Sequence, residues 1–213
     1  MDLYFAPLAC SMASRIALYE AGAAANFIQV DLRKKRVLKD DSDFFAINGM
    51  GQAPTLNTRD GVITENPVVL QYIADRFPDA KLAPPATSLG RYHLQQWLNF
   101  ISTELHKQVF IPVLDPHAPG GAKEFAQAKS AMAFKFLDRH LSGREFLLND
   151  FSVADAYLVT VLNWAHVIKF DLDAYPNVRA YYARLRERPS VAKALSEETA
   201  LWLEEKAREQ KAA

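Results

Sequence analysis

Hydrophobic and polar positions follow different periods in the two parts of the chain. Up to residue 77, apolar residues come in short runs separated by turns, and in the run 28–32 they alternate with polar residues. The dipeptide Asp60-Gly61 separates two further runs, which is the pattern of a β-hairpin. A small mixed α/β domain is therefore predicted, with strands at 3–6, 28–32, 55–58 and 62–64 and helices at 12–22 and 66–77.

From residue 88 onward, apolar residues recur every three or four positions, which is the helical period. Helices are predicted at about 88–110, 122–140 and 176–188, with another beginning near 152 and one running from 190 to the end. Between the two patterns, Pro84-Pro85 cannot continue a helix and indicates a linker. The prediction is an α/β domain at 1–77, a linker at 78–87 and an all-helical domain at 88–213.

Composition limits the classes of partner. The 213 residues include 25 Lys and Arg and 25 Asp and Glu, so the formal net charge is zero. This balance gives no support for nucleic acid or an anionic membrane as the main partner. The one cysteine excludes an internal disulfide and a multi-cysteine metal site, and it fits a reducing compartment. With no visible secretory signal and no apolar run long enough to span a bilayer, a cytoplasmic protein without a metal is predicted.

The cysteine stands where the first predicted strand gives way to a helix. Cys10 follows the turn broken by Pro7, and Ser11 is a suitable cap for the helix that begins at Met12. A thiol at a helix start lies near unpaired backbone N–H groups and the positive end of the helix dipole, which favour the thiolate. A lone cysteine is also commonly a small buried hydrophobe, so the residues alone leave both interpretations open.

The first helix of the second part carries a stripe of hydrogen-bonding residues. Gln95, Asn99, Thr103 and His106 are spaced by four, four and three, which places them on one helix face. The stripe contains few full charges, which suits a cleft wall better than open solvent. His106 would supply a titratable hydrogen-bond donor, and Lys107 would supply a cation. Near Cys10 the cation would stabilise the thiolate, whereas an exposed His-Lys pair would have no effect on the thiol.

Two sites in the first domain are candidates for ligand binding. Pro54 lies at the start of a predicted strand, and a proline there, including one in the cis form, would leave the backbone of Ala53 free to pair with an extended peptide. Asn66 is a suitable cap for the helix whose first position is Pro67. Glu65 would then be free to meet a ligand ammonium group.

Asp155 is a candidate that capping explains. Ser152 and Asp155 have the spacing of a capping box in which the N3 residue is a carboxylate. Each side chain would then bond a backbone N–H at the start of the helix. We therefore assign Asp155 a structural role and not a catalytic one.

Taken together, these motifs resemble the beta class of bacterial glutathione S-transferases over essentially the whole chain. The motifs around Cys10, in 96–101 and in 104–107 are specific to that class, and the others are shared by the wider superfamily. The matching segments are 9–11, 30–35, 51–54, 64–67, 96–101, 104–107 and 151–158.

The resemblance implies a thioredoxin-like amino-terminal domain and an all-helical carboxyl-terminal domain, assembled as a homodimer. It implies that reduced glutathione, as substrate, is conjugated to a small hydrophobic electrophile. Cys10 would face the glutathione sulfur, while His106 and Lys107 would adjust its electrostatics, so these three residues are the implied catalytic group. The residues implied to bind glutathione are Cys10, Lys35 (glycine carboxylate), Ala53 (backbone, cysteinyl part), Glu65 and Asn66 (γ-glutamyl end), and Asn99, Thr103, Glu104, Leu105 and His106 (cleft wall).

Some positions depart from the family pattern. Phe5 stands where a tyrosine is common, and Met50 replaces a lysine near the glutathione pocket. The loop before Phe151 is one residue shorter than in relatives.

Two other functions stay open at this point: a thiol-disulfide reductase that uses Cys10 through a mixed disulfide with glutathione, and a non-catalytic binding module.

Overall fold

The computed structural model describes residues 1–212, which form two compact units. The first unit comprises Met1–Leu82 together with the C-terminal residues from Arg188 onward, and the second comprises Ala83–Glu187. No helix among the described residues is long and apolar enough to cross a membrane.

The first unit is a five-stranded mixed sheet with helices, and its strand order is β3-β2-β1-β4-β5. Strand β1 is central, parallel to β2 and antiparallel to β4, and β4 and β5 form the predicted hairpin. This is the thioredoxin-like arrangement. The elements are β1 (Asp2–Phe5), α1 (Met12–Glu20), β2 (Asn26–Asp31), β3 (Arg36–Val37), η1 (Phe44–Ala46), β4 (Thr55–Thr58), β5 (Gly61–Ile63), α2 (Asn66–Arg76) and η2 (Pro78–Ala80).

Both faces of the central strand are covered, as its continuous apolar run predicts. Phe5 packs under the guanidinium of Arg15 from α1, which lies 4.2 Å from the ring centroid. Tyr4 points to the opposite face, where its ring lies 5.8 Å from that of Phe44 in a cluster that includes Val30. The two-residue strand β3 is absent from the prediction because the basic run around it favours a solvated loop.

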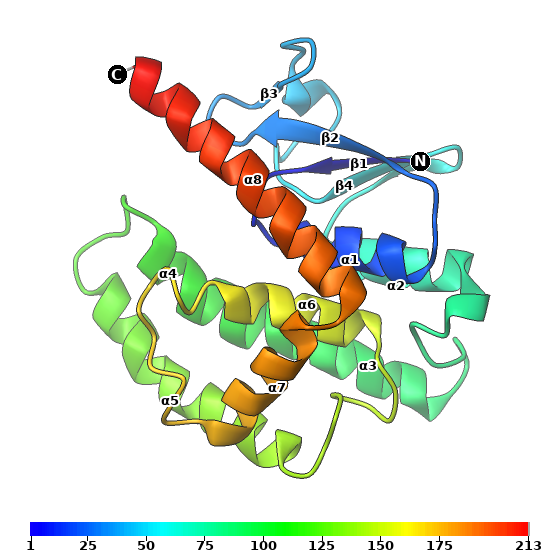
Figure 1. Cartoon of the computed structure of the whole chain (residues 1–213), viewed down its shortest axis with the longest axis vertical. Helices are drawn as coiled ribbons and strands as arrows, with labels where there is room; N and C mark the ends of the chain where they lie inside the picture. The colour runs from blue at the N-terminus through cyan, green and yellow to red at the C-terminus, as the bar shows by residue number, and fades with distance from the viewer. Residues whose placement is uncertain (213) are drawn as a thin grey trace. The chain divides into compact units, whose positions relative to one another are not determined.

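The C-terminal helix α8 (Pro189–Ala212) belongs to the first unit. Figure 1 shows it passing from α1 toward β2. Arg188, just before α8, pairs with Glu20 at 2.6 Å, and Gln29 of β2 donates to Glu205 at 3.4 Å. This grouping differs from the sequence division, which placed all of 88–213 in the helical domain. The sequence could not show this grouping, because α8 has the same helical period as its neighbours. Its polar partners in the first unit lie more than 160 residues away in the chain.

The second unit is entirely helical in its regular structure. Helix α6 contacts α3, η3 and α7, and its first ten residues are buried, as its apolar composition predicts. The capping box of Ser152 and Asp155 is present and confirms the structural assignment of Asp155. The elements are α3 (Leu89–Phe100), η3 (Ile101–Phe110), α4 (Ile111–Leu114), α5 (Ala122–Leu141), α6 (Val153–Asn163) and α7 (Pro176–Arg186).

The predicted helix at 88–110 exists but changes type halfway. After Phe100 the backbone continues as the π-helix η3, which spans ten residues. A π-helix closes i→i+5 hydrogen bonds and so takes in more residues per turn than an α-helix. Beyond residue 101, the α-helical period therefore no longer predicts which residues lie on the same face of the helix.

Candidate functional site

Cys10 lies in the turn between β1 and α1, two residues before the helix begins. Ser11 occupies the N-cap position of α1, but its side chain makes no capping hydrogen bond, so the predicted capping by its hydroxyl is wrong. Its own backbone is already helical (φ −61°, ψ −20°), and its hydroxyl turns back to Ala6, donating to the carbonyl at 3.2 Å and accepting from the N–H at 3.3 Å. Ser11 therefore ties the Cys10 turn to the end of β1.

The thiol of Cys10 faces the backbone of the segment before Pro54. Its Sγ donates to the carbonyl of Ala53 at 3.3 Å, and the residue is partly exposed. Only the protonated thiol can make this bond, because a thiolate has no hydrogen to donate. In this arrangement the cysteine is a partly exposed hydrogen-bond donor to the Ala53 carbonyl, and not a buried hydrophobe.

The Ala53-Pro54 peptide is cis, and the segment lies beyond the end of the sheet ladder. Pairing between β1 and β4 stops at Tyr4 and Thr55, so Ala53 is outside the last pair. Asn48 holds this segment, with its amide nitrogen donating to the Gln52 carbonyl at 2.8 Å and to the Thr55 hydroxyl at 2.9 Å. Asn48 is buried. The sequence reasoning missed its role because Asn48-Gly49 looks like an ordinary turn.

Lys35 lies against the same segment. Its Nζ donates to the Gly51 carbonyl at 2.9 Å, and its side chain is half-buried. Gly51 has φ +56°, and a Cβ there would lie 2.9 Å from Lys35 Cδ and 2.9 Å from Phe45 Cε1. Glycine is required at this position because any side chain would displace the lysine. The structure thus brings Lys35, Ala53 and Cys10 together on one side of the unit.

Glu65, and not Asn66, is the N-cap of α2. It is exposed and has φ +64°, a conformation that residues with side chains rarely adopt, and its carbonyl accepts from the N–H groups of Val68 and Val69. Asn66 is 4% exposed, and both ends of its side chain are engaged. Its Nδ2 donates to the Cys10 carbonyl at 3.1 Å, and its Oδ1 accepts from Ser14 at 3.0 Å. The predicted capping by Asn66 is therefore wrong.

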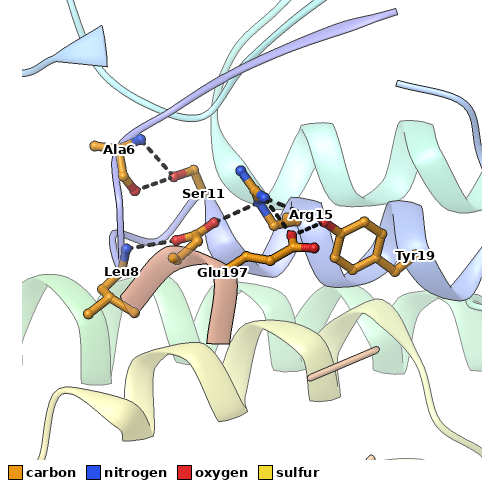
Figure 2. A network of polar contacts seen from close by, with 7 residues as sticks. Ala6, Leu8, Ser11, Arg15, Tyr19 and Glu197 are labelled. Atoms are coloured by element: carbon orange, nitrogen blue, oxygen red, sulfur yellow. Dashed lines mark hydrogen bonds and ion pairs between the residues drawn. The ribbon is translucent and has the colours of Figure 1, made fainter. Parts of the chain in front are cut away.

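A polar network that no sequence pattern indicated connects α1 and α8 with the turn before Cys10 (Figure 2). Arg15 of α1 pairs with Glu197 and Glu198 of α8, each at 3.0 Å, and Tyr19 donates to Glu197. Glu198 also accepts from the N–H of Leu8, a residue with φ +58°, at 2.7 Å. Burial raises the pKa of Glu198 to about 8, against the opposing effect of Arg15. The last helix thus holds the turn that carries the thiol.

Of the stripe predicted in the second unit, only part is on the surface. Asn99 and Thr103 are exposed, and Thr103 Oγ1 donates to the Asn99 carbonyl at 3.0 Å and to Glu104 at 3.1 Å. Leu105 is fully buried, so only its backbone could meet a ligand. Because η3 is a π-helix, His106 does not continue the exposed face.

His106 is a buried histidine of the helical unit. Its ring is 5% exposed, and Nδ1 lies 2.7 Å from the hydroxyl of Tyr157. Burial, aided by the charge of Lys107, lowers the pKa of His106 to about 3. The histidine is therefore neutral at pH 7, which corrects the idea that it titrates there. Lys107 itself is exposed.

Comparisons with known proteins agree with this architecture. Two family models match, "Glutathione S-transferase, N-terminal domain" over residues 1–75 and "Glutathione S-transferase, C-terminal domain" over residues 115–184. Glutathione S-transferase GstA of Escherichia coli O157:H7 is 40% identical over 200 residues, covering 93% of this chain and 98% of that protein.

Solved structures extend the match. A beta-class glutathione S-transferase of Sphingomonas chungbukensis is 42% identical with a TM-score of 0.88, covering 93% of this chain and 98% of that one. A sphingomonad glutathione S-transferase complexed with glutathione is 39% identical with a TM-score of 0.88, covering 93% and 99%. A thioredoxin-like unit with a thiol facing the segment before a cis-proline, joined to a helical unit, is the fold of a glutathione transferase. The chain belongs to the glutathione S-transferase family and is a transferase of the bacterial beta class.

Proposed function

We propose that the protein is a cytoplasmic enzyme that conjugates reduced glutathione to hydrophobic electrophiles. The observation that supports this most is the Cys10 thiol 3.3 Å from the Ala53 carbonyl, beyond the last pair of the β1–β4 ladder. An unpaired backbone edge can bind an extended peptide through main-chain hydrogen bonds. The cysteinyl part of glutathione bound there would bring its sulfur to Cys10. The sphingomonad relative solved with glutathione supports the same ligand.

The two ends of glutathione have oppositely charged partners near this edge. Lys35 bonds Gly51, two residues before Ala53, and supplies a cation for the glycine carboxylate. Glu65 is exposed at the start of α2 and supplies an anion for the γ-glutamyl ammonium. The side chain of Asn66 is already engaged, so its contribution to glutathione is the free N–H at the helix start.

Residues of the helical unit are the other part of the proposal. We propose that Asn99, Thr103 and Glu104 contact glutathione through their side chains and Leu105 through its backbone. His106, being neutral, would act through a hydrogen bond and not through a positive charge. Lys107 would supply the positive charge.

The rate advantage would come from the glutathione thiolate, which is the nucleophile. Each unit by which the thiol pKa falls is worth about 1.4 kcal/mol of differential stabilisation. Starting from a thiol pKa of about 8.5, a shift of one to two units would make about a quarter to three quarters of the bound glutathione anionic at pH 7.

Conjugation of a chlorinated nitrobenzene and of several other electrophiles tests the proposal. A glutathione-dependent rate above background, lost when Lys35 or Glu65 is replaced by alanine, is expected. No rate with any electrophile would contradict the proposal. Arg59→Ala is the control, because Arg59 is an exposed residue in the β4–β5 turn.

A second candidate is disulfide reduction, which the presence of a partly exposed thiol at this edge favours. The Cys10 thiolate would attack the glutathione sulfur of a mixed disulfide, forming Cys10–S–S–glutathione and releasing the other thiolate. Reduced glutathione would then attack this bond, giving oxidised glutathione and restoring Cys10. If Cys10→Ser keeps conjugation and loses reduction, Cys10 works in redox exchange. The family assignment argues against the third possibility, a non-catalytic binding module.

We also propose that the protein is a homodimer. Large apolar side chains are exposed on α3 and α5, and the Phe136 ring lies 5.3 Å from Phe100 and 5.7 Å from Trp97, which places the two helices side by side. An apolar face of this kind indicates a partner. Met132→Glu should dissociate the dimer in light scattering, whereas Val62→Glu, at an exposed apolar residue of β5 in the first unit, should not. A monomeric wild-type protein would overturn the proposal. The exposed residues are Leu89, Tyr92, Phe125, Met132 and Phe136.

A further inference from the structure

Asn66 connects two helices of the first unit to the residue that carries the thiol. A carbonyl oxygen can only accept a hydrogen bond, so the amide nitrogen of Asn66 faces the Cys10 carbonyl, 3.1 Å away. The amide oxygen then accepts from the hydroxyl of Ser14 at 3.0 Å. Ser14 is fully buried on α1, and Asn66 is the first residue of α2. The amide is therefore held at both ends and has one orientation.

This contact acts on the Cys10 backbone and not on its thiol. The Cys10 carbonyl accepts from Asn66 and also from the N–H of Ala13 in its own helix, at 3.2 Å. With the carbonyl fixed from two sides, the peptide plane of Cys10 cannot rotate without breaking a hydrogen bond. The direction of the Cα–Cβ bond relative to this carbonyl follows from that plane, and the thiol beyond it donates to the Ala53 carbonyl at 3.3 Å.

From this geometry we propose that Asn66 is a positioning residue for Cys10, and that Ser14 acts through Asn66. The side chain of Asn66 does not bind glutathione; it fixes the place of the thiol against Ala53, where the glutathione sulfur would lie. The place given to the glutathione sulfur rests on the proposed function. The orientation of the thiol by Asn66 does not depend on glutathione.

The decisive measurement is the alkylation of the single cysteine by iodoacetamide without glutathione, as a function of pH. In the wild type the protonated thiol is bonded to Ala53, so alkylation is slow. Asn66→Ala frees the Cys10 carbonyl, and we expect alkylation at neutral pH to become several-fold faster. Ser14→Ala should change the rate in the same direction by less, because Asn66 keeps its bond to Cys10 and loses only its own anchor. The double variant, Ser14→Ala with Asn66→Ala, should be alkylated no faster than Asn66→Ala alone, because Ser14 acts on Cys10 only through Asn66.

A matched control separates positioning from a loss of stability. Ser130 is a buried serine in α5 whose hydroxyl donates to the Gln127 carbonyl at 2.7 Å. Ser130→Ala should lower the melting temperature to a similar extent as Ser14→Ala and leave the alkylation of Cys10 unchanged. If Ser14→Ala and Asn66→Ala alkylate at the wild-type rate at every pH, Asn66 has no positioning role. If Ser130→Ala accelerates alkylation as much as they do, the effect is general loosening and the proposal is wrong.

Kinetics give a second readout for the same variants. Asn66→Ala should lower kcat/KM for conjugation by about tenfold, as expected for one lost hydrogen bond, and should move the acid limb of the pH profile to higher pH. Asn66→Asp cannot donate to the Cys10 carbonyl and should not rescue the rate. If the wild type itself neither binds nor conjugates glutathione, the proposed function fails, while the alkylation result still decides the role of Asn66. If Asn66→Ala does not fold, Ser14→Ala carries both measurements.

Discussion

Each unit contains a fully buried carboxylate, and the two are stabilised in different ways. Asp155 accepts hydrogen bonds from two backbone N–H groups and two hydroxyls, and most of these donors lie within eight residues of it. Glu198 accepts from the N–H of Leu8, 190 residues away, and is paired with a buried arginine. Burial raises the pKa of both carboxyl groups. The comparison teaches that a carboxylate with local donors completes one helix, whereas a carboxylate with distant partners joins separate parts of its unit.

The largest loss of stability is expected for Glu198→Ala. This substitution leaves the guanidinium of Arg15 buried with one remaining partner, Glu197, which is partly exposed. Removal of one partner from this buried pair should lower the free energy of unfolding by about 4 kcal/mol. Glu198→Gln keeps an oxygen for the Leu8 N–H and should lose less. Urea unfolding of the two variants checks this, and equal losses below about 1 kcal/mol would show that the charge pair is unimportant.

Asp155→Ala should cost somewhat less, about 3 kcal/mol, because it removes a helix cap and several buried hydrogen bonds but leaves no unpaired charge. The control is Ser152→Ala, which removes one partner and should cost about 1 kcal/mol. Both are measured by urea unfolding. A loss for Asp155→Ala no larger than for Ser152→Ala would mean that the Leu147 and Tyr181 bonds contribute nothing.

Two buried groups, Glu198 of the first unit and His106 of the second, should make opposite contributions to the pH dependence of stability. The pKa of Glu198 rises from 4.5 to about 8 on folding, so the folded state retains a proton that the unfolded state releases. Its contribution to stability is fully present below pH 4.5 and is lost as the pH rises toward 8. The pKa of His106 falls from 6.5 to about 3, so its contribution is present above pH 6.5 and is lost as the pH falls toward 3.

Unfolding free energies measured between pH 4.5 and 6.5 can separate these contributions. Relative to wild type, Glu198→Gln should lose the component that decreases with rising pH, and His106→Phe should lose the component that increases. His106→Phe also leaves the Tyr157 hydroxyl without this partner, which adds a penalty that does not depend on pH. Parallel curves for wild type and both variants would contradict the two assignments.

The smallest effects are expected for the tyrosines that bond the acidic groups. Tyr181 is buried and donates to Asp155 at 2.7 Å, so Tyr181→Phe should cost about 1.5 kcal/mol. Tyr19 donates to Glu197, which is partly exposed, so water can replace the hydroxyl. Tyr19→Phe should therefore cost less than about 0.5 kcal/mol. Thermal unfolding of the pair measures the difference, and a reversed order would contradict it.

The contrast between local and distant contacts also explains which features could be predicted from the sequence. The strands, helices and the Ser152–Asp155 box were predictable because each depends on residues close together in the chain. The roles proposed for Cys10 and Ala53 came from a family resemblance, and the structure adds their contact. Most of what could not be predicted depends on distant contacts: Asn66 bonds Cys10 and not its own helix end, and Glu198 meets Leu8. Ser11 is the exception, because its partner Ala6 is only five residues away. The burial of His106 was missed because a π-helix has no clear signature in the sequence and changes the face on which the residue lies.

The position of α8 in the first unit has a consequence for how the protein is made. The chain leaves the ribosome from its amino terminus, and domains often fold as they emerge. Here Glu198, which binds the turn before Cys10, is synthesised 190 residues after Leu8. The sheet can form early, but the turn that carries the thiol gains this anchor only after α8 has been synthesised. A nascent chain that stops before α8 therefore holds this turn without the contact between Leu8 and Glu198.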